Sequence, residues 1–147
     1  NVGTRMQRLE TQDLHATLLA AAGLNRLALT PDAALPLDPR QLVPAAGQGA
    51  LAVQCRSDDS QMLAWLGALH CADTDDCVTA ERSFLNALDG SCRTPIAAYA
   101  TVLEDTISLH GRLLSDDGQD AVEASRTGTH QNQENIHFHH PLQFFGQ

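Results

Sequence analysis

The chain has 147 residues, 43% of them hydrophobic, so it can bury a core as one large domain or two small ones. Its 18 acidic residues outnumber its 9 basic ones, and the net charge of -9 argues against nucleic-acid binding, which requires a concentrated basic surface. No apolar run of the sequence approaches the length of a membrane span, so we expect no membrane partner.

All basic residues other than histidine are arginines, because the sequence contains no lysine. Any anion site must therefore use guanidinium groups, which bind carboxylates through paired hydrogen bonds. The same composition excludes a Schiff-base lysine within this chain.

Cysteine usage and the first residues indicate a cytoplasmic protein. The cysteines are irregularly spaced and form no Cys-x-x-Cys pair, which predicts reduced thiols rather than a disulfide framework or a zinc site. The sequence starts at Asn1 without a methionine, a basic segment or an apolar signal core. We therefore expect no targeting sequence and a chain that is the later part of a longer protein.

Two short helices are expected in the first 30 residues. Thr4 can cap a helix running through residues 6–10, with Arg5 beside backbone N–H groups where an anion could bind. Residues 14–22 are apolar enough for a buried strand or helix, which periodicity cannot separate. A helical turn carrying Arg26 follows. On this segment alone, a solvated surface arginine is the favoured interpretation of Arg5.

Four prolines between residues 30 and 44 predict a loop or domain connection. Gly47 and Gly49 then flank Gln48, a pattern compatible with a plain turn, a hinge, or close approach of backbone to a ligand. It matches neither a dinucleotide fingerprint nor a phosphate loop. The following segment, Leu51–Cys55, alternates like a strand.

Two helices are predicted next. Residues 57–60 supply an N-cap for the first, whose apolar stripe we expect in the core; the stripe and its neighbour are Met62, Leu63, Leu66, Leu69 and Trp65. Residues 73–76 begin the second, which Gly90 closes. Its residues at core spacing are Cys77, Val78, Phe84, Leu85 and Leu88. Glu81 and Arg82 are expected to form an exposed charge pair.

Three strands are predicted at residues 96–103, 107–114 and 121–127, separated by turn sequences. We therefore expect a small antiparallel meander packed on helices. The fold class is α/β to α+β, with a three-stranded antiparallel sheet in the later domain.

Cys92 follows the predicted helix end and precedes the β-rich run, so it belongs to a connecting loop. Such a boundary suits a reactive side chain, whereas most free cysteines are small buried hydrophobes, and this segment alone leaves both interpretations open. Residues 128–147 are rich in Gln, Asn and His, which predicts a loosely ordered tail. Metal binding through His137, His139 and His140 is the alternative.

Five stretches in order resemble the porphobilinogen deaminase family, also called hydroxymethylbilane synthase. They are NVGTR (1–5), AAGLNRL (21–27), PAAGQGAL (44–51), TAERSF (79–84) and GSCRTPI (90–96). The resemblance covers residues 1–127 and corresponds to the later half of that enzyme, which has three α/β domains.

The resemblance implies a division into four parts. Residues 1–49 would be a partial second domain of a ligand-binding α/β fold, and 50–67 a strand and helix normally packed on the first domain. Residues 68–127 would form an incomplete third domain that carries the cofactor, followed by the divergent tail 128–147. The first domain, with the family's proton-transferring aspartate, corresponds to sequence upstream of Asn1, so no catalytic residue is expected here.

The resemblance also implies the chemistry. In the family a dipyrromethane cofactor is joined by a thioether to a loop cysteine, which Cys92 matches. It primes the stepwise condensation of four porphobilinogen units, with loss of ammonia, to give hydroxymethylbilane. Arg5 and Arg26 match arginines that bind cofactor and substrate carboxylates. Arg82 matches a further arginine of the family pattern. The Gly47–Gly49 segment matches the crossing between domains, consistent with a hinge.

Two readings of function stay open. The first is a transferase of tetrapyrrole biosynthesis, cytoplasmic and, as the full-length enzyme, monomeric. The second is a catalytically inactive fragment, or a carboxylate-binding remnant, that lacks the first domain.

Overall fold

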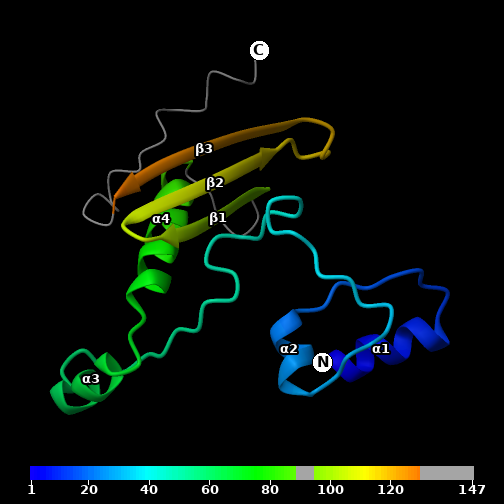
Figure 1. Cartoon of the computed structure of the whole chain (residues 1–147), viewed down its shortest axis with the longest axis horizontal. Coiled ribbons are helices and arrows are strands. Elements are labelled where there is room, and N and C mark those ends of the chain that lie inside the picture. The colour runs from blue at the N-terminus through cyan, green and yellow to red at the C-terminus, as the bar shows by residue number, and fades with distance from the viewer. Residues whose placement is uncertain (89–94, 130–147) are drawn as a thin grey trace. The chain divides into compact units, whose positions relative to one another are not determined.

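The computed structural model describes residues 1–88 and 95–129. The chain forms two compact units, Asn1–Asp38 and Pro39–Gln147. Helices dominate the first unit and a three-stranded sheet dominates the second (Figure 1).

The first unit contains helices α1 (Val2–Thr11) and α2 (Ala21–Arg26). The expected Thr4 cap is wrong, because Asn1 caps α1: its Oδ1 accepts hydrogen bonds from the backbone N–H and the hydroxyl of Thr4, each at 2.9 Å. The buried element expected at residues 14–22 is also wrong. Only its last two residues are helical, and Leu18 is exposed, because this unit offers no sheet against which an extended segment could pair.

The second unit confirms the antiparallel meander. Strands β1 (Ile96–Leu103), β2 (Thr106–Leu114) and β3 (Ala121–Thr129) are hydrogen-bonded in the order β1-β2-β3. The connection between β1 and β2 uses Glu104 at φ 53°, and Gly118 at φ 70° allows the turn before β3. The predicted fold class is thus correct for this part of the chain.

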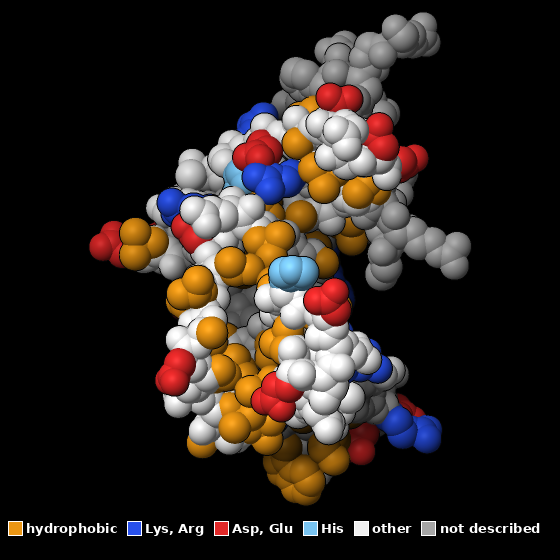
Figure 2. All heavy atoms as spheres, turned by 90° about the vertical axis from the view of Figure 1, so that its right-hand side faces the viewer, with side chains coloured by type: hydrophobic (Ala, Val, Ile, Leu, Met, Phe, Trp, Pro, Cys, Tyr) orange, Lys and Arg blue, Asp and Glu red, His pale blue; other side chains and the backbone are white. Residues whose placement is uncertain are grey.

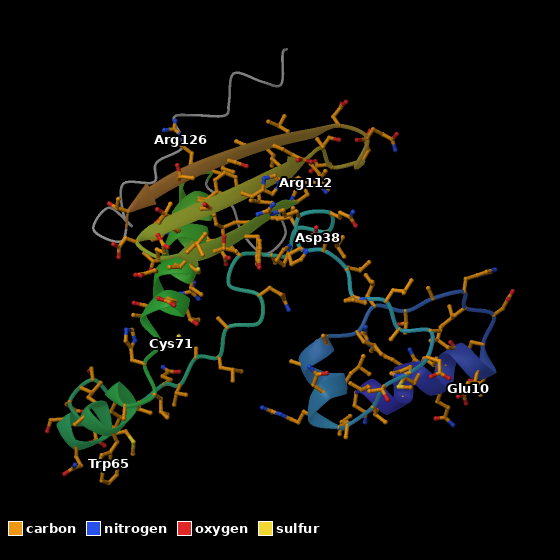
Figure 3. All side chains as sticks on the ribbon, in the orientation of Figure 1. Glu10, Asp38, Trp65, Cys71, Arg112 and Arg126 are labelled. Carbon is orange, nitrogen blue, oxygen red and sulfur yellow. The ribbon has the colours of Figure 1, made fainter. Side chains whose placement is uncertain are left out.

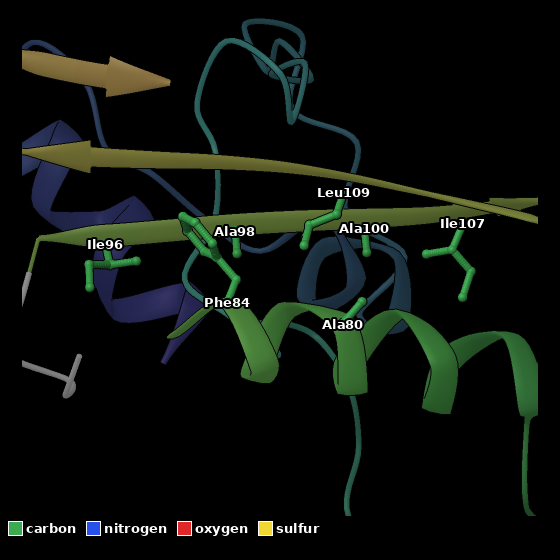
Figure 4. Packing of buried hydrophobic residues seen from close by; sticks show 7 residues of the cluster. All are labelled: Ala80, Phe84, Ile96, Ala98, Ala100, Ile107 and Leu109. Carbon is green, nitrogen blue, oxygen red and sulfur yellow. The ribbon is translucent and has the colours of Figure 1, made fainter. Parts of the chain in front are cut away.

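Helix α4 (Ala72–Ala87) covers one face of the sheet (Figure 1). Ala80 and Phe84 of α4 pack against alternate residues of β1 and β2, which form the main core (Figure 4). The sheet members of this core are Ile96, Ala98, Ala100, Ile107 and Leu109. Opposite Phe84 the sheet has Gly111, where an added Cβ would lie 2.6 Å from the ring carbon Cε1. The aromatic ring therefore occupies the place of a side chain on β2.

Helix α3 (Ser60–Gly67) has the predicted cap, since Oδ1 of Asp59 accepts from the Met62 N–H at 2.9 Å. Its expected place in the core is wrong: Trp65 is 62% exposed and projects from the helix (Figure 3). The strand expected at Leu51–Cys55 is not formed either, and Leu51 is 89% exposed. Within the described residues no strand lies beside this segment to complete its hydrogen bonds.

Hydrophobic side chains consequently reach the surface at many points, as the space-filling view shows (Figure 2). A folded protein always exposes apolar atoms, but a run of large aliphatic and aromatic residues within one segment is unusual. Residues 51–69 contain such a run: Leu51, Val53, Leu63, Trp65 and Leu69.

Candidate functional site

The two candidate carboxylate-binding arginines lie on successive helices of the first unit. Arg5 is in the first turn of α1, and its Nη1 donates to the Leu18 carbonyl at 3.1 Å. Arg26 is the last residue of α2, and both side chains are exposed. A guanidinium has five N–H donors, so the bond to Leu18 orients Arg5 without exhausting it. Both residues fit the carboxylates of a dipyrromethane in their chemistry and accessibility.

The candidate anchor, Cys92, lies outside the described residues. The chain around it is bounded by Leu88, the C-cap of α4, and by Ile96, the first residue of β1. The predicted histidine cluster at residues 137–140 also lies outside the described residues. Arg82, the further arginine of the family pattern, is an exposed residue of α4.

Glu81 was predicted to be exposed beside Arg82, and that prediction is wrong. Glu81 is only 6% exposed, and its two carboxylate oxygens accept hydrogen bonds from two separate segments of the chain. Oε2 accepts from the Gly47 N–H at 2.7 Å and Oε1 from the Ala100 N–H at 2.8 Å. Burial raises the pKa of Glu81, and these two hydrogen bonds oppose the rise.

The sequence contained a signal for this burial. Glu81 follows Cys77 by four residues and precedes Phe84 by three, so it lies on the predicted core stripe. Buried carboxylates are rare in general, so the spacing alone did not predict burial. The two backbone donors that compensate for it come from distant parts of the chain, which the local sequence does not show.

A hollow of about 280 Å³ lies beside this carboxylate. The turn 47–50, the first half of α4 and β1 line it; the α4 and β1 members are Asp73, Thr74, Cys77, Val78, Glu81, Tyr99 and Ala100. Burial and the charges of Glu81, Asp76 and Asp73 raise the pKa of Cys77, so this thiol is a poor nucleophile.

Cys71, at the start of α4, has the opposite character. It is exposed, and the Thr74 hydroxyl donates to its Sγ at 3.2 Å, which lowers the pKa of the thiol (Figure 3). It is therefore the matched comparison for Cys92 in any experiment on cysteine reactivity.

The other face of the sheet, opposite α4, carries a second hollow of about 430 Å³. Three of its polar side chains have partners: His110 lies 2.9 Å from the Ser125 hydroxyl, and Glu123 accepts a hydrogen bond at 2.7 Å from Nε of Arg112, which lies outside the lining. Arg112 also donates to the Gln41 carbonyl at 3.2 Å, so these residues hold the start of the second unit against the sheet.

Residues 1–88 and 95–129 offer neither a metal-binding cluster nor a membrane-spanning helix. No group of three or more His, Cys, Asp or Glu side chains there could hold a metal ion. None of the helices described is long and apolar enough to cross a membrane.

Comparison with known proteins gives two family matches in chain order. Residues 1–64 match the model described as porphobilinogen deaminase, dipyromethane cofactor binding domain, and residues 76–138 match porphobilinogen deaminase, C-terminal domain. Curated relatives named porphobilinogen deaminase include those of Staphylococcus carnosus, 45% identical over 130 residues, and Staphylococcus saprophyticus, 47% identical over 131. These alignments cover 87% and 88% of this chain but 42% of each relative.

Proposed function

Because this chain belongs to the porphobilinogen deaminase family, we propose that it is the later part of a hydroxymethylbilane synthase. The whole enzyme would condense four porphobilinogen units, release ammonia at each addition, and produce hydroxymethylbilane for tetrapyrrole synthesis. The observation that carries the proposal is the match of two consecutive domains of one enzyme over most of the chain.

The residues of this chain would bind and hold rather than transfer protons. Cys92 would anchor the dipyrromethane through a thioether, since a thiolate is the nucleophile best suited to capture the carbon left by loss of ammonia. When bound, the dipyrromethane supplies the pyrrole carbon to which substrate units are joined. Arg5 and Arg26 would bind its carboxylates and those of the substrate. The family's proton-transferring aspartate has no match in this chain.

The exposed run at residues 51–69 supports the proposed division into parts. Residues 50–67 would pack on a first domain, which would cover Leu51 and Trp65 and offer a strand to complete hydrogen bonding. Residues 1–49 would belong to the second domain and 68–127 to the third, with 128–147 as a divergent tail.

The enzyme is proposed to act in the cytoplasm as a monomer, with porphobilinogen as its small-molecule partner. The acidic net charge of -9 supports the absence of a nucleic-acid partner. No membrane partner is proposed.

The alternative function is a catalytically inactive fragment, or a carboxylate-binding remnant that uses Arg5 and Arg26. The chain spans 42% of the length of the curated relatives it matches, and Arg5 and Arg26, both exposed, support the carboxylate-binding role. The uncovered apolar residues at 51–69 favour it for the chain in isolation.

The test compares this chain alone with the same chain produced together with the upstream part of its reading frame. We expect the longer protein to show an intact mass increased by one dipyrromethane and to release ammonia and hydroxymethylbilane from porphobilinogen. The chain alone should do neither. Turnover by the chain alone would exclude the inactive-fragment alternative, whereas a longer protein without adduct or turnover would overturn the proposed function.

Replacing Arg5 or Arg26 with glutamine in the longer protein should raise the KM for porphobilinogen by about tenfold or more. A charged hydrogen bond to a carboxylate contributes about 1.5–3 kcal/mol, and glutamine lacks both the positive charge and the reach of the guanidinium group. The measurement is the dependence of initial rate on porphobilinogen concentration. Arg8→Gln is the matched control, because Arg8 is an exposed residue of the same helix as Arg5. An equal rise for Arg8→Gln would indicate a general charge effect and contradict specific binding.

A further inference from the structure

The outer edge of β1 is occupied by two unlike acceptors. Because β1 lies at the end of the order β1-β2-β3, its outward N–H groups face no other strand among residues 1–88 and 95–129. The Ala98 N–H donates to the Pro44 carbonyl at 2.9 Å, and the Ala100 N–H donates to Oε1 of Glu81. The first acceptor on this edge is thus a backbone carbonyl of the segment before the sheet, and the second is a side chain of α4.

The second oxygen of Glu81 completes a link to the same connecting segment. The Gly47 N–H donates to Oε2, and Gly47 has φ 73°, a conformation that favours glycine. One carboxylate therefore joins a turn 34 residues away to a strand 19 residues away. At the Ala100 N–H, Oε1 replaces the carbonyl group that a neighbouring strand would have offered.

Backbone donors, rather than a cation, hold this charge. No arginine or histidine is among the residues that line the hollow beside Glu81 in the part of the chain described. The titratable groups around it are Asp73 and Cys77 on α4 and Tyr99 on β1, and Asp76 of α4 adds negative charge nearby. Burial disfavours the charged carboxylate, and the two backbone hydrogen bonds oppose that effect.

We propose that Glu81 is a positioning residue that fastens the Pro44–Ala50 segment to the open edge of β1, and that loss of its negative charge loosens the Gly47 turn while the sheet stays folded. Two acceptor oxygens on one rigid group are required. Glutamine offers one acceptor and turns an N–H group toward the other donor, and aspartate is one methylene shorter. The proposal concerns contacts within the second unit and is independent of the proposed chemistry.

Amide hydrogen exchange of the 147-residue chain, followed by NMR, tests this proposal. In Glu81→Ala, exchange at Gly47 and Ala100 should be faster by about tenfold or more, while Leu109 in β2 stays protected. Glu81→Gln should accelerate one of these two amides more than the other. Arg82→Gln, an exposed neighbour on α4, should change neither. Unchanged exchange at Gly47 and Ala100 in Glu81→Ala would overturn the proposal, and so would equal acceleration at Leu109.

A pH titration of the wild-type chain tests the proposal without relying on a variant that folds. Because burial raises the pKa of Glu81, its protonation should begin above the range of an ordinary glutamate. Exchange at Gly47, corrected for the intrinsic pH dependence, should rise together with the change in the Glu81 side-chain carbon shift. The Ala98 amide, bonded to Pro44 rather than to Glu81, should respond less. Constant protection of Gly47 through the titration of Glu81 would contradict the proposal.

Discussion

Replacing Cys92 with serine in the protein that includes the upstream sequence is expected to abolish covalent cofactor loading, and with it turnover of porphobilinogen. A serine hydroxyl remains protonated near neutral pH, whereas a cysteine reaches the thiolate form that attacks carbon. Intact-mass measurement should show the unmodified chain for Cys92→Ser and one dipyrromethane adduct for the wild type. Turnover should fall below detection, because no other residue of this chain is proposed to hold the primer.

Cys71→Ser is the matched control for this prediction. Cys71 is exposed, and the Thr74 hydrogen bond lowers its pKa, so it is the described thiol most suited to unspecific alkylation. Loading and turnover should survive its replacement. A modified peptide containing Cys71 instead of Cys92, or full loading of Cys92→Ser, would contradict the assignment of the anchor.

The sheet was predictable because its information is local. Buried positions alternate with less buried ones along β1 and the first part of β2, and turn residues separate all three strands, so sequence order alone predicts the meander. The caps show the limit of this reasoning. The cap predicted within residues 57–60 is present, at Asp59, whereas the cap predicted at residues 73–76 is wrong, because Cys71 stands at the start of α4. Asn1 rather than the predicted Thr4 caps α1, because both residues can cap a helix and only the backbone path decides between them.

The failures share a physical cause, which is dependence on a partner far away in the sequence. Leu51–Cys55 alternates like a strand, but a strand needs neighbours to satisfy its backbone, and the described chain provides none there. The prediction that Glu81 is exposed fails for the opposite reason, because the distant N–H groups of Gly47 and Ala100 make its burial possible. The proposed roles of Arg5, Arg26 and Cys92 came from a family resemblance, since the local patterns are compatible with a solvated surface for Arg5 and with a small buried thiol for Cys92.

The second unit should be most sensitive to changes where Phe84 meets Gly111. Phe84→Ala is expected to lower the free energy of unfolding by about 3–5 kcal/mol, because it leaves a cavity between α4 and the sheet. Gly111→Ala should cost about 1–3 kcal/mol, since the new Cβ would lie 2.6 Å from the Phe84 ring and one of them must move. The free energy of unfolding of a domain is typically only about 5–15 kcal/mol, so Phe84→Ala would remove a large share of the stability of this unit.

A double-mutant cycle measured by urea unfolding, with circular dichroism as the signal, isolates the contact between these two residues. With the ring removed, the alanine at position 111 meets no obstacle, so Gly111→Ala should cost less in the Phe84→Ala background than in the wild type. Phe84→Leu provides a background that remains folded if the alanine variant does not. Leu103→Ala on β1 is the control, because Leu103 is 78% exposed and its truncation should change stability by less than about 0.5 kcal/mol. Strict additivity of the two substitutions would show that the ring does not occupy the space above Gly111.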